Sequence, residues 1–221
     1  MAVDRLVVVG PLEVGKMQFI SEQDKKRISN AIQTVESKTS GELVTVIARA
    51  SDNYLYIPVL WAALLTLLLP APFLFMDITF ILADLYLYQL SCFVLLVLLF
   101  LNQNIRRHLI PPSVRRHRAH RHAMEQFLLN NLSGTQQSNG ILLFVSIAEH
   151  YVEIIADKNI NDRVESEVWK NIVDDFTVRV RRGEIAEGFL GAIQVCGELL
   201  QQHFPAHKDN SNELPDHLVI V

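Results

Sequence analysis

The sequence predicts an α/β protein with a small mixed sheet flanked by helices, interrupted by a two-helix transmembrane hairpin. Short β-rich runs alternate with amphipathic helical patterns in both parts of the chain, which is typical of a layered α/β domain. Two long uncharged stretches lie between the first predicted strand and the next. Each is close to the length of about 20 apolar residues that a helix needs to cross a bilayer.

The composition excludes several classes of protein. Of the 221 residues, 50% are apolar and 20% are charged, which is too apolar for a disordered chain or a coiled coil. The net charge of -4 argues against a globally basic nucleic-acid binder. Cys92 and Cys196 are too few for a disulfide framework or a cysteine-rich zinc site. Two unpaired thiols fit a reducing compartment.

The two uncharged stretches predict the transmembrane hairpin. The first has 24 residues, 53–76, and the second has 21, 85–105. We expect spans over about 57–75 and 85–101, with Pro70 ending or kinking the first of them. Two buried core helices are the alternative, but so small a domain has too little other surface to cover two wholly apolar helices.

Charges beside the spans predict their orientation. The short connection contains Asp77 and Asp84 but neither lysine nor arginine. A stretch with six arginines and no acid follows the second span, and such an excess marks the cytoplasmic side. We therefore expect both termini in the cytoplasm, the protein in the plasma (inner) membrane, and this stretch against anionic lipid heads. Its members are Arg106, Arg107, Arg115, Arg116, Arg118 and Arg121.

The first soluble element is a helix that begins after Ser21. Ser21 and Asp24 have the spacing of a helix cap with an acid at the third position. The apolar residues that follow recur with helical spacing, and Gly41 is expected to close the helix as its C′ glycine. Residues 43–47 then form a short buried strand.

The chain after the hairpin predicts the rest of the domain. We expect a helix over 114–132, followed by strands over 141–146 and 151–156 that are joined as a hairpin. A polar loop over 157–163 follows. Two helices complete the domain: one runs from Val164 and ends at Gly183, and the last runs from Ile185 and stops at His203–Pro205. The tail is expected to be loose from Ala206 to Leu218.

The domain organisation follows from this order. A single strand cannot fold alone, so the first strand must pair with those after the hairpin. The hairpin is thus an insertion into one domain. The expected segments are a leader over 1–19 (or a true start at Met17), the two parts of the domain over 20–53 and 105–205, the hairpin over 54–104, and a tail over 206–221.

Candidate site residues are sparse. G-x-S-x-G, P-loop and G-x-G-x-x-G motifs are absent from the sequence. Four histidines gather near the basic stretch, but interleaved arginines repel a cation there; they are His108, His117, His120 and His122. Arginines before Gly183 suit the end of a helix better than a phosphate clamp. The acidic candidates are Glu42, Asp52, Asp157, Asp162, Glu165, Asp174 and Asp175.

Three segments of the soluble part resemble the TPM domain, also called the TPM phosphatase or photosystem-II repair family. They read SEQDKKRISNAIQTVESKTSGELVTVIA (21–48), NGILLFVSIAEHYVEIIAD (139–157) and VRRGEIAEGFLGAI (180–193). The arrangement is most similar to the bacterial membrane subgroup, in which a transmembrane hairpin splits the domain.

The resemblance implies a sheet between helices, with an acidic cleft near strand ends that binds calcium or another divalent cation in some members. Asp52 and Asp157 are then the candidate ligands for calcium or magnesium. Some members are weak phosphatases, and others act in membrane-complex assembly. This chain departs from the family at Ser138, where an acid is common, and at 157–161, where a glycine-rich turn is usual.

Three functions remain open from the sequence. The leading hypothesis is an integral membrane protein whose cytoplasmic TPM-like domain binds, regulates or assembles a membrane-protein partner. The alternative is a divalent-cation-dependent phosphatase, which requires at least three of four acids to converge: Asp52, Asp157, Asp162 and Glu165. Transport through Asp77 and Asp84 is the third hypothesis, and a single hairpin is too small for it without oligomerisation.

Overall fold

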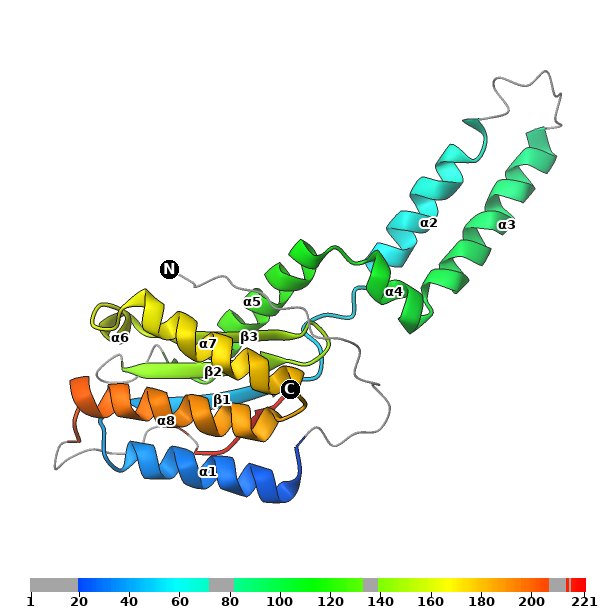
Figure 1. Cartoon of the computed structure of the whole chain (residues 1–221). Coiled ribbons are helices and arrows are strands. Elements are labelled where there is room, and N and C mark those ends of the chain that lie inside the picture. Colours follow the sequence, from blue (N-terminus) through cyan, green and yellow to red (C-terminus); the bar gives the residue numbers. More distant parts are fainter. Residues whose placement is uncertain (1–19, 72–81, 133–138, 207–213, 215) are drawn as a thin grey trace. The chain divides into compact units, whose positions relative to one another are not determined.

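The computed structural model describes residues 20–71, 82–132, 139–206, 214 and 216–221. The chain divides into two compact units (Figure 1). The α/β unit combines residues up to Ser51 with residues from Arg116 onward, and the helical unit is the continuous segment Asp52–Arg115. The expected leader and part of the tail lie outside the described residues.

Helices and strands of the α/β unit follow closely the elements that the sequence predicts. In chain order they are α1 (Glu22–Glu36), β1 (Glu42–Ala48), α5 (Pro112–Leu129), β2 (Gly140–Ser146), β3 (Tyr151–Ala156), α6 (Lys158–Asn161), α7 (Ser166–Arg181), α8 (Ile185–His203) and β4 (Val219–Ile220). The first turn of α5 belongs to the helical unit, since the boundary between units falls at Arg116.

A four-stranded mixed sheet forms the centre of the unit, in the order β3-β2-β1-β4. β1 is parallel to β2, with Glu42 opposite Gly140, and β2 is antiparallel to β3. The mixed sheet and the pairing across the insertion are therefore confirmed. β4 was not predicted; it pairs in parallel with β1 within the segment expected to be the tail.

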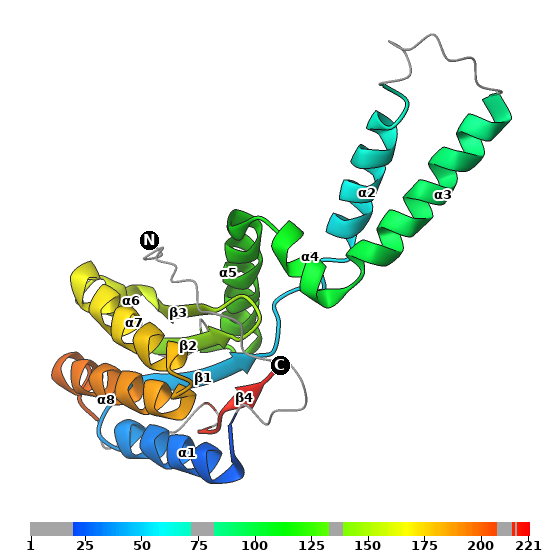
Figure 2. The same ribbon diagram turned by 45° about the vertical axis from the view of Figure 1, so that its right-hand side comes forward.

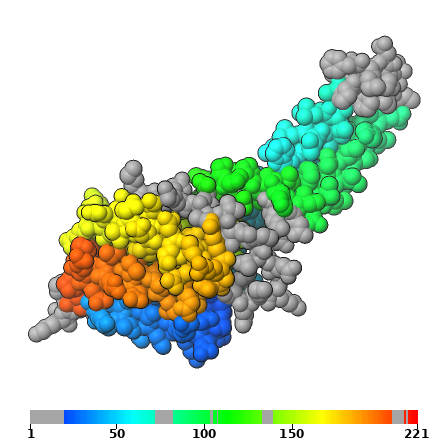
Figure 3. All heavy atoms as spheres, in the orientation of Figure 1, coloured from blue at the N-terminus to red at the C-terminus, as the bar shows by residue number. Residues whose placement is uncertain are grey.

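Helices cover both faces of the sheet (Figure 2). The helices α1, α7 and α8 lie side by side on one face (Figure 3), where they bury Leu43 and Ile47 of β1. Val44 and Val46 of the same strand join the core on the other face, beneath α5. Alternate residues of a strand point to opposite faces, so β1 needs apolar residues on both faces to fill two cores.

α5 packs on its face of the sheet through small residues. Ala119, Ala123 and Phe127 are spaced four residues apart and are buried with Phe144 of β2. Alanine lets the helix approach the strands closely, while Phe127 fills the space beyond. This packing decides which side of α5 faces the sheet and which side is exposed.

The start of α1 is confirmed and its end is corrected. Ser21 Oγ accepts a hydrogen bond from Asp24 N at 3.1 Å, as the capping pattern predicts. The helix ends at Glu36 with Ser37 as its C-cap, so Gly41 is not the C′ residue. A Cβ at Gly41 would lie 2.6 Å from Leu200 Cδ2. This glycine is therefore required for close packing against α8.

The segment after β3 is also corrected. The expected loop over 157–163 contains the short helix α6, which Asp157 caps by accepting from Lys158 N at 2.7 Å. The end of α7 is as predicted, because Gly183 has the positive φ of 79° that a C′ glycine adopts.

The helical unit contains α2 (Tyr56–Leu68), α3 (Leu82–Phe100) and α4 (Gln103–Leu109). α2 and α3 pack against each other. α4 was not predicted. Asp77 lies outside the described residues, whereas Asp84 is in the first turn of α3.

α2 ends seven residues before the expected end of the first span at residue 75. Pro70 explains this end, because it has no N–H to donate to the carbonyl of Thr66. That carbonyl instead accepts from Leu69 N at 3.3 Å and from Gln89 Nε2 of α3 at 3.0 Å. Pro70 thus leaves the carbonyl of Thr66 available to accept a hydrogen bond from Gln89 of the neighbouring helix.

Candidate functional site

Open α/β sheets bind ligands at the carboxyl ends of their strands, so a site is expected at the ends of β1 and β2. Ser146 is the last residue of β2, Glu149 lies in the turn to β3, and Ser51 follows the end of β1. The chain beyond β2 continues to pair with the end of β1, because Ile147 N donates to Ala48 O at 3.0 Å.

These residues form a hydrogen-bonded cluster, which we call the strand-end cluster (Ser51, Ser146 and Glu149); Ser51 is partly exposed. Ser51 Oγ donates to Ser146 Oγ at 2.9 Å, and Ser146 Oγ donates to Glu149 Oε2. Ser51 N also donates to Glu149 Oε2, at 3.0 Å. Ser146 and Glu149 are 0% and 3% exposed, so the cluster fixes the chain where it leaves β1.

The chemistry of the strand-end cluster is limited by this burial. Carboxylate and hydroxyl oxygens are ligands that hard cations accept, although one carboxylate supplies little charge. A nucleophilic serine needs a base and access to substrate, and Ser146 is fully buried. The sequence prediction missed this cluster. A signal was present, since a serine ends an apolar strand and an acid lies in the short turn after it.

The predicted cation ligands Asp52 and Asp157 do not come together. Asp52 follows Ser51 and thus lies beside the last residue of β2. Asp157 N instead donates to the carbonyl of Gly140, the first residue of β2, at 2.9 Å. The two acids are separated by the length of a seven-residue strand, roughly 20 Å.

The other predicted acids have separate local roles. Asp162 is the C-cap of α6 and Glu165 the N-cap of α7. On α7, Asp175 pairs with Arg179 at 2.8 Å. Within the described ranges, no three His, Cys, Asp or Glu side chains form a group that could hold a metal ion. The convergence that the phosphatase hypothesis required is therefore not found in this part of the chain.

One acid outside those expectations has an unusual environment. Glu36, at the end of α1, is 8% exposed, and its Oε1 accepts from Leu43 N at 2.9 Å. Burial raises the pKa of Glu36 to about 9, with Glu42 and Asp216 nearby adding to the effect. Cys196 on α8 is also buried, which raises the pKa of its thiol to about 12. Neither group lies at the strand-end cluster.

Two of the four predicted histidines, His120 and His122, serve the packing of α5. His120 Nδ1 lies 2.7 Å from Glu153 Oε1 of β3, and Tyr151 donates to the other oxygen of that carboxylate at 3.0 Å. The ring of His122 meets Phe144 edge-on, with centroids 5.6 Å apart. These contacts tie α5 to the sheet.

The predicted basic stretch covers the end of the helical unit and the first half of α5. Arg121 is exposed and pairs with Glu125, with 3.4 Å between Nε and Oε1. The side chain of Arg107 lies outside the described residues. Four further arginines are partly exposed: Arg106, Arg115, Arg116 and Arg118.

The helical unit has an extensively apolar surface. The two longer helices expose many large side chains, among them Leu67 at 68%, Leu95 at 67% and Leu98 at 65%. By length and composition, one helix in the described part of the chain, α3, could cross a membrane. α2 is apolar too, but shorter, with 13 residues.

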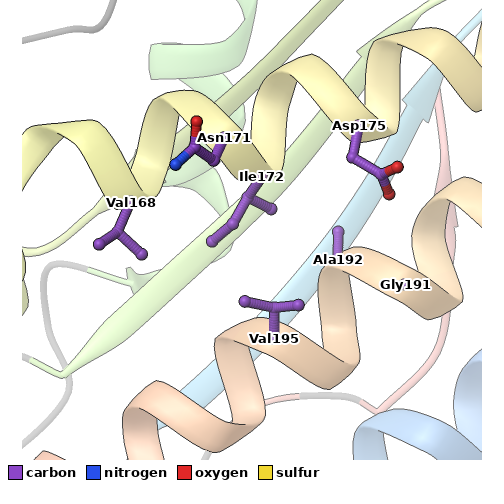
Figure 4. Close-up of a pocket in the computed structure, with 7 residues that line it drawn as sticks. All are labelled: Val168, Asn171, Ile172, Asp175, Gly191, Ala192 and Val195. Carbon is purple, nitrogen blue, oxygen red and sulfur yellow. The ribbon is translucent and has the colours of Figure 1, made fainter.

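A shallow groove of about 260 Å³ lies between α7 and α8 (Figure 4). Val168 and Ile172 line it from α7, and Ala192 and Val195 from α8. Asp175 stands at one end, where Arg179 already neutralises it. The groove therefore offers little that would orient a polar ligand.

The chain is similar to known proteins in part of its sequence and in its fold. The family model of the TPM domain matches residues 105–199. The predicted TPM resemblance is thus supported over that range, which excludes residues 21–48. The chain is also similar to the BA42 protein of the psychrophilic bacterium Bizionia argentinensis, solved by NMR.

That likeness has a TM-score of 0.59 at 19% identity and covers 94% of this chain and 99% of BA42. At such identity it shows the fold alone. No curated protein matches the chain.

Proposed function

We propose that this protein is an integral membrane protein whose helical unit crosses the plasma (inner) membrane as a hairpin. Its TPM-like α/β unit lies in the cytoplasm, where it binds, regulates or assembles a membrane-protein partner. The observation that carries the proposal is the apolar surface of α2 and α3, of which Leu67 and Leu95 are examples. Soluble monomers rarely expose a contiguous apolar surface of this extent.

The lengths of the two helices support a hairpin. With a rise of 1.5 Å per residue, α3 is about 28 Å long, close to the thickness of the hydrocarbon core. α2 reaches only about 20 Å, but the uncharged sequence continues from Leu68 to Met76. The first span expected from the sequence, 57–75, is therefore longer than α2.

Polar groups within the two helices also suit a bilayer. Thr66 Oγ1 donates to Ala62 O at 2.8 Å, and Ser91 Oγ donates to Leu87 O at 2.7 Å. Each hydroxyl is satisfied by its own helix, as a hydroxyl without water nearby must be. Gln89 of α3 donates a side-chain hydrogen bond to α2.

A binding role is favoured over turnover by the burial of the strand-end cluster. Ser146 is fully buried and Glu149 is 3% exposed, so neither presents a reactive atom to a substrate. A domain held at the bilayer by its own insertion is well placed to bind a membrane protein. The α/β unit would then be a scaffold whose surface carries the function.

The topology is tested by cysteine labelling in intact cells that express the full chain. In a background with Cys92→Ser and Cys196→Ala, single cysteines are placed by Thr79→Cys or Ser113→Cys. We expect a membrane-impermeant maleimide to label position 79 in intact cells and position 113 only after permeabilisation. Labelling of position 113 alone would reverse the orientation, and recovery of the protein in the soluble fraction would refute the membrane assignment.

The divalent-cation-dependent phosphatase is retained as a second candidate because of Glu149, a buried carboxylate at the end of the sheet where ligands bind. The test measures hydrolysis of p-nitrophenyl phosphate by the purified full chain with calcium or magnesium. Activity that is lost in Glu149→Gln, while the variant still melts cooperatively, would establish this function. Equal background rates with and without cation would exclude it for this substrate.

A further inference from the structure

The outward side of α5 carries an unusual surface, which we call the α5 outer surface. It consists of six exposed residues: His117, Arg121, Met124, Leu128, Leu129 and the acid Glu125. The first four are spaced by four, three and four residues, so they lie in one row along the helix. Ala119, Ala123 and Phe127 lie on the opposite side and pack on the sheet. The row is thus held outward by the core.

The apolar half of this surface stands out within the α/β unit. Leu128 is 60% exposed and Leu129 is 76% exposed, and Met124 adjoins them at 38%. On the other side of the sheet, Val178 of α7 and Val195 of α8 are 42% and 39% exposed. These two valines are smaller and less exposed than the two leucines. Scattered exposed residues of that kind need no explanation, whereas adjacent leucines at the end of a helix indicate a binding surface.

The other half of the helix is basic. α5 carries Arg115, Arg116, Arg118 and Arg121 against one acid, Glu125. Glu125 pairs with Arg121, and the first half of the helix contains arginines but no acid of its own. Basic side chains beside exposed apolar ones are typical of helices that lie at the surface of an anionic bilayer.

The chain itself brings α5 to such a surface. α3 ends at Phe100 and α5 begins at Pro112, so only a short segment containing α4 separates the two helices. If α3 crosses the membrane, this connection holds the start of α5 close to the lipid heads. A second binding event on a short tether takes place at high effective concentration, so even weak lipid contacts would be occupied.

We propose that the α5 outer surface binds the anionic face of the bilayer into which the helical unit is inserted. Arg121 contacts lipid phosphates, while Met124, Leu128 and Leu129 reach the boundary of the acyl chains. Long basic side chains can extend to the heads while their stems stay on apolar surface. This inference rests on the proposed function, because it requires the helical unit to be in the membrane.

The test uses the full chain reconstituted into vesicles of phosphatidylcholine with or without phosphatidylserine. In the background with Cys92→Ser and Cys196→Ala, an environment-sensitive NBD probe is attached after Leu128→Cys or, as the matched control, Val178→Cys. Both positions are exposed, so neither substitution removes a core contact. Leu129→Cys provides a second position on the same surface. Brominated lipids then report contact with acyl chains.

We expect the probe at position 128 to emit at a shorter wavelength than the probe at position 178. Brominated lipids should also quench the probe at position 128 several-fold more strongly. The difference should be larger with phosphatidylserine and should shrink in high salt or in Arg121→Gln. Equal quenching at the two positions would overturn the inference. A blue shift without lipid quenching, lost when the protein is diluted in lipid, would assign the surface to another protein molecule and would also overturn it.

Flotation of the same vesicles separates this inference from the proposed function. Protein that remains with the vesicles after alkaline carbonate treatment is inserted, whatever the probe at position 128 reports. Insertion with equal quenching refutes only the role of the α5 outer surface. Protein that carbonate releases from the vesicles refutes the proposed function, and this inference with it.

Discussion

The two units of this protein are built from similar apolar residues but place them in opposite ways. The α/β unit buries most of its large side chains, and Phe144, Phe176 and Phe189 are examples. The helical unit exposes most of its leucines, of which Leu95 and Leu98 are each about two-thirds exposed. The difference shows that residue type alone does not decide whether a leucine is buried. Under the proposed function, the helical unit would meet lipid where the α/β unit meets water.

The polar groups show the same contrast. In the α/β unit, buried polar side chains meet partners from distant parts of the chain, as Ser51 meets Ser146. In the helical unit, Thr66 and Ser91 bond to carbonyls of their own helices. Hydrogen bonds between distant residues specify one arrangement of the core. Hydrogen bonds within a helix satisfy its polar side chains even where no water is present.

The largest effect is expected from a cavity in the α/β core. Phe189 is fully buried and packs edge-on against Phe176, with ring centroids 4.9 Å apart. Phe189→Ala should lower the free energy of unfolding of the α/β unit by about 3–5 kcal/mol. The measurement is denaturant unfolding of the full chain in detergent, followed by Trp169 fluorescence in a Trp61→Phe background.

Leu95→Ala is the matched control for this cavity. It also truncates a large apolar side chain, but one that is 67% exposed in the helical unit. The Trp169 transition should therefore stay where it is in the parent. If both variants shifted that transition equally, the two units would not be distinct in stability, and the contrast between them would be wrong.

A lysine on α3 distinguishes a lipid-facing surface from one that faces water. Leu95→Lys should cost about 3–4 kcal/mol of insertion free energy if residue 95 lies near the bilayer centre. The fraction of the full chain in carbonate-washed membranes should fall accordingly. In water the same change at an exposed position would be nearly neutral, so undiminished membrane recovery would contradict the hairpin. Val178→Lys, on the α/β unit, is the control that should change nothing.

Much of the fold could be predicted because its signals are local. The strands β2 and β3 and the helices α7 and α8 have apolar patterns that define their period and bounds, and Gly183 marks a helix end by its own backbone conformation. β4 has no such signal. Val219 and Ile220 form a strand only because the edge of β1 is open beside them. α6 depends on a single cap at Asp157. An aspartate among polar residues is also typical of a loop, so the sequence pattern does not distinguish the two.

The candidate site was harder to predict because it depends on tertiary contacts. Ser51 and Ser146 meet across an insertion, which no spacing in the sequence reveals. Gly41 was assigned to a helix end, although its function is close contact with Leu200. The separation of Asp52 and Asp157 could have been foreseen. An antiparallel β3 returns the chain to the start of β2, at the far end of the sheet from the acid that follows β1.

Glu36 makes the stability of the α/β unit depend on pH. The pKa of Glu36 is raised from 4.5 to about 9 in the folded protein, so the folded state holds a proton that the unfolded state releases. Its contribution to stability is therefore complete below pH 4.5 and is lost as the pH rises toward 9. Glu36→Gln keeps the neutral shape and should stabilise the unit by roughly 2–3 kcal/mol at neutral pH.

The measurement for Glu36 is the urea midpoint of parent and variant across this pH range. The two curves should converge at acid pH and separate as the pH rises. Glu165→Gln is the control, since Glu165 is an exposed cap residue with no side-chain cap hydrogen bond. Parallel curves for the parent and Glu36→Gln would show that Glu36 is ionised in the folded protein.

The smallest expected effect concerns the bond that joins the two helices of the helical unit. Gln89 Nε2 donates to Thr66 O at 3.0 Å, the acceptor that Pro70 leaves without its usual donor. Gln89→Leu should therefore weaken the α2–α3 pair by about 1 kcal/mol, as interhelical hydrogen bonds in membranes do. The measurement is the midpoint of SDS-induced unfolding, followed by Trp61 fluorescence in a Trp169→Phe background. Ser91→Ala removes a hydroxyl that bonds within α3, so it should leave the midpoint unchanged. If instead both variants lowered the midpoint alike, polarity in general would stabilise the pair, and the proline would have no specific partner.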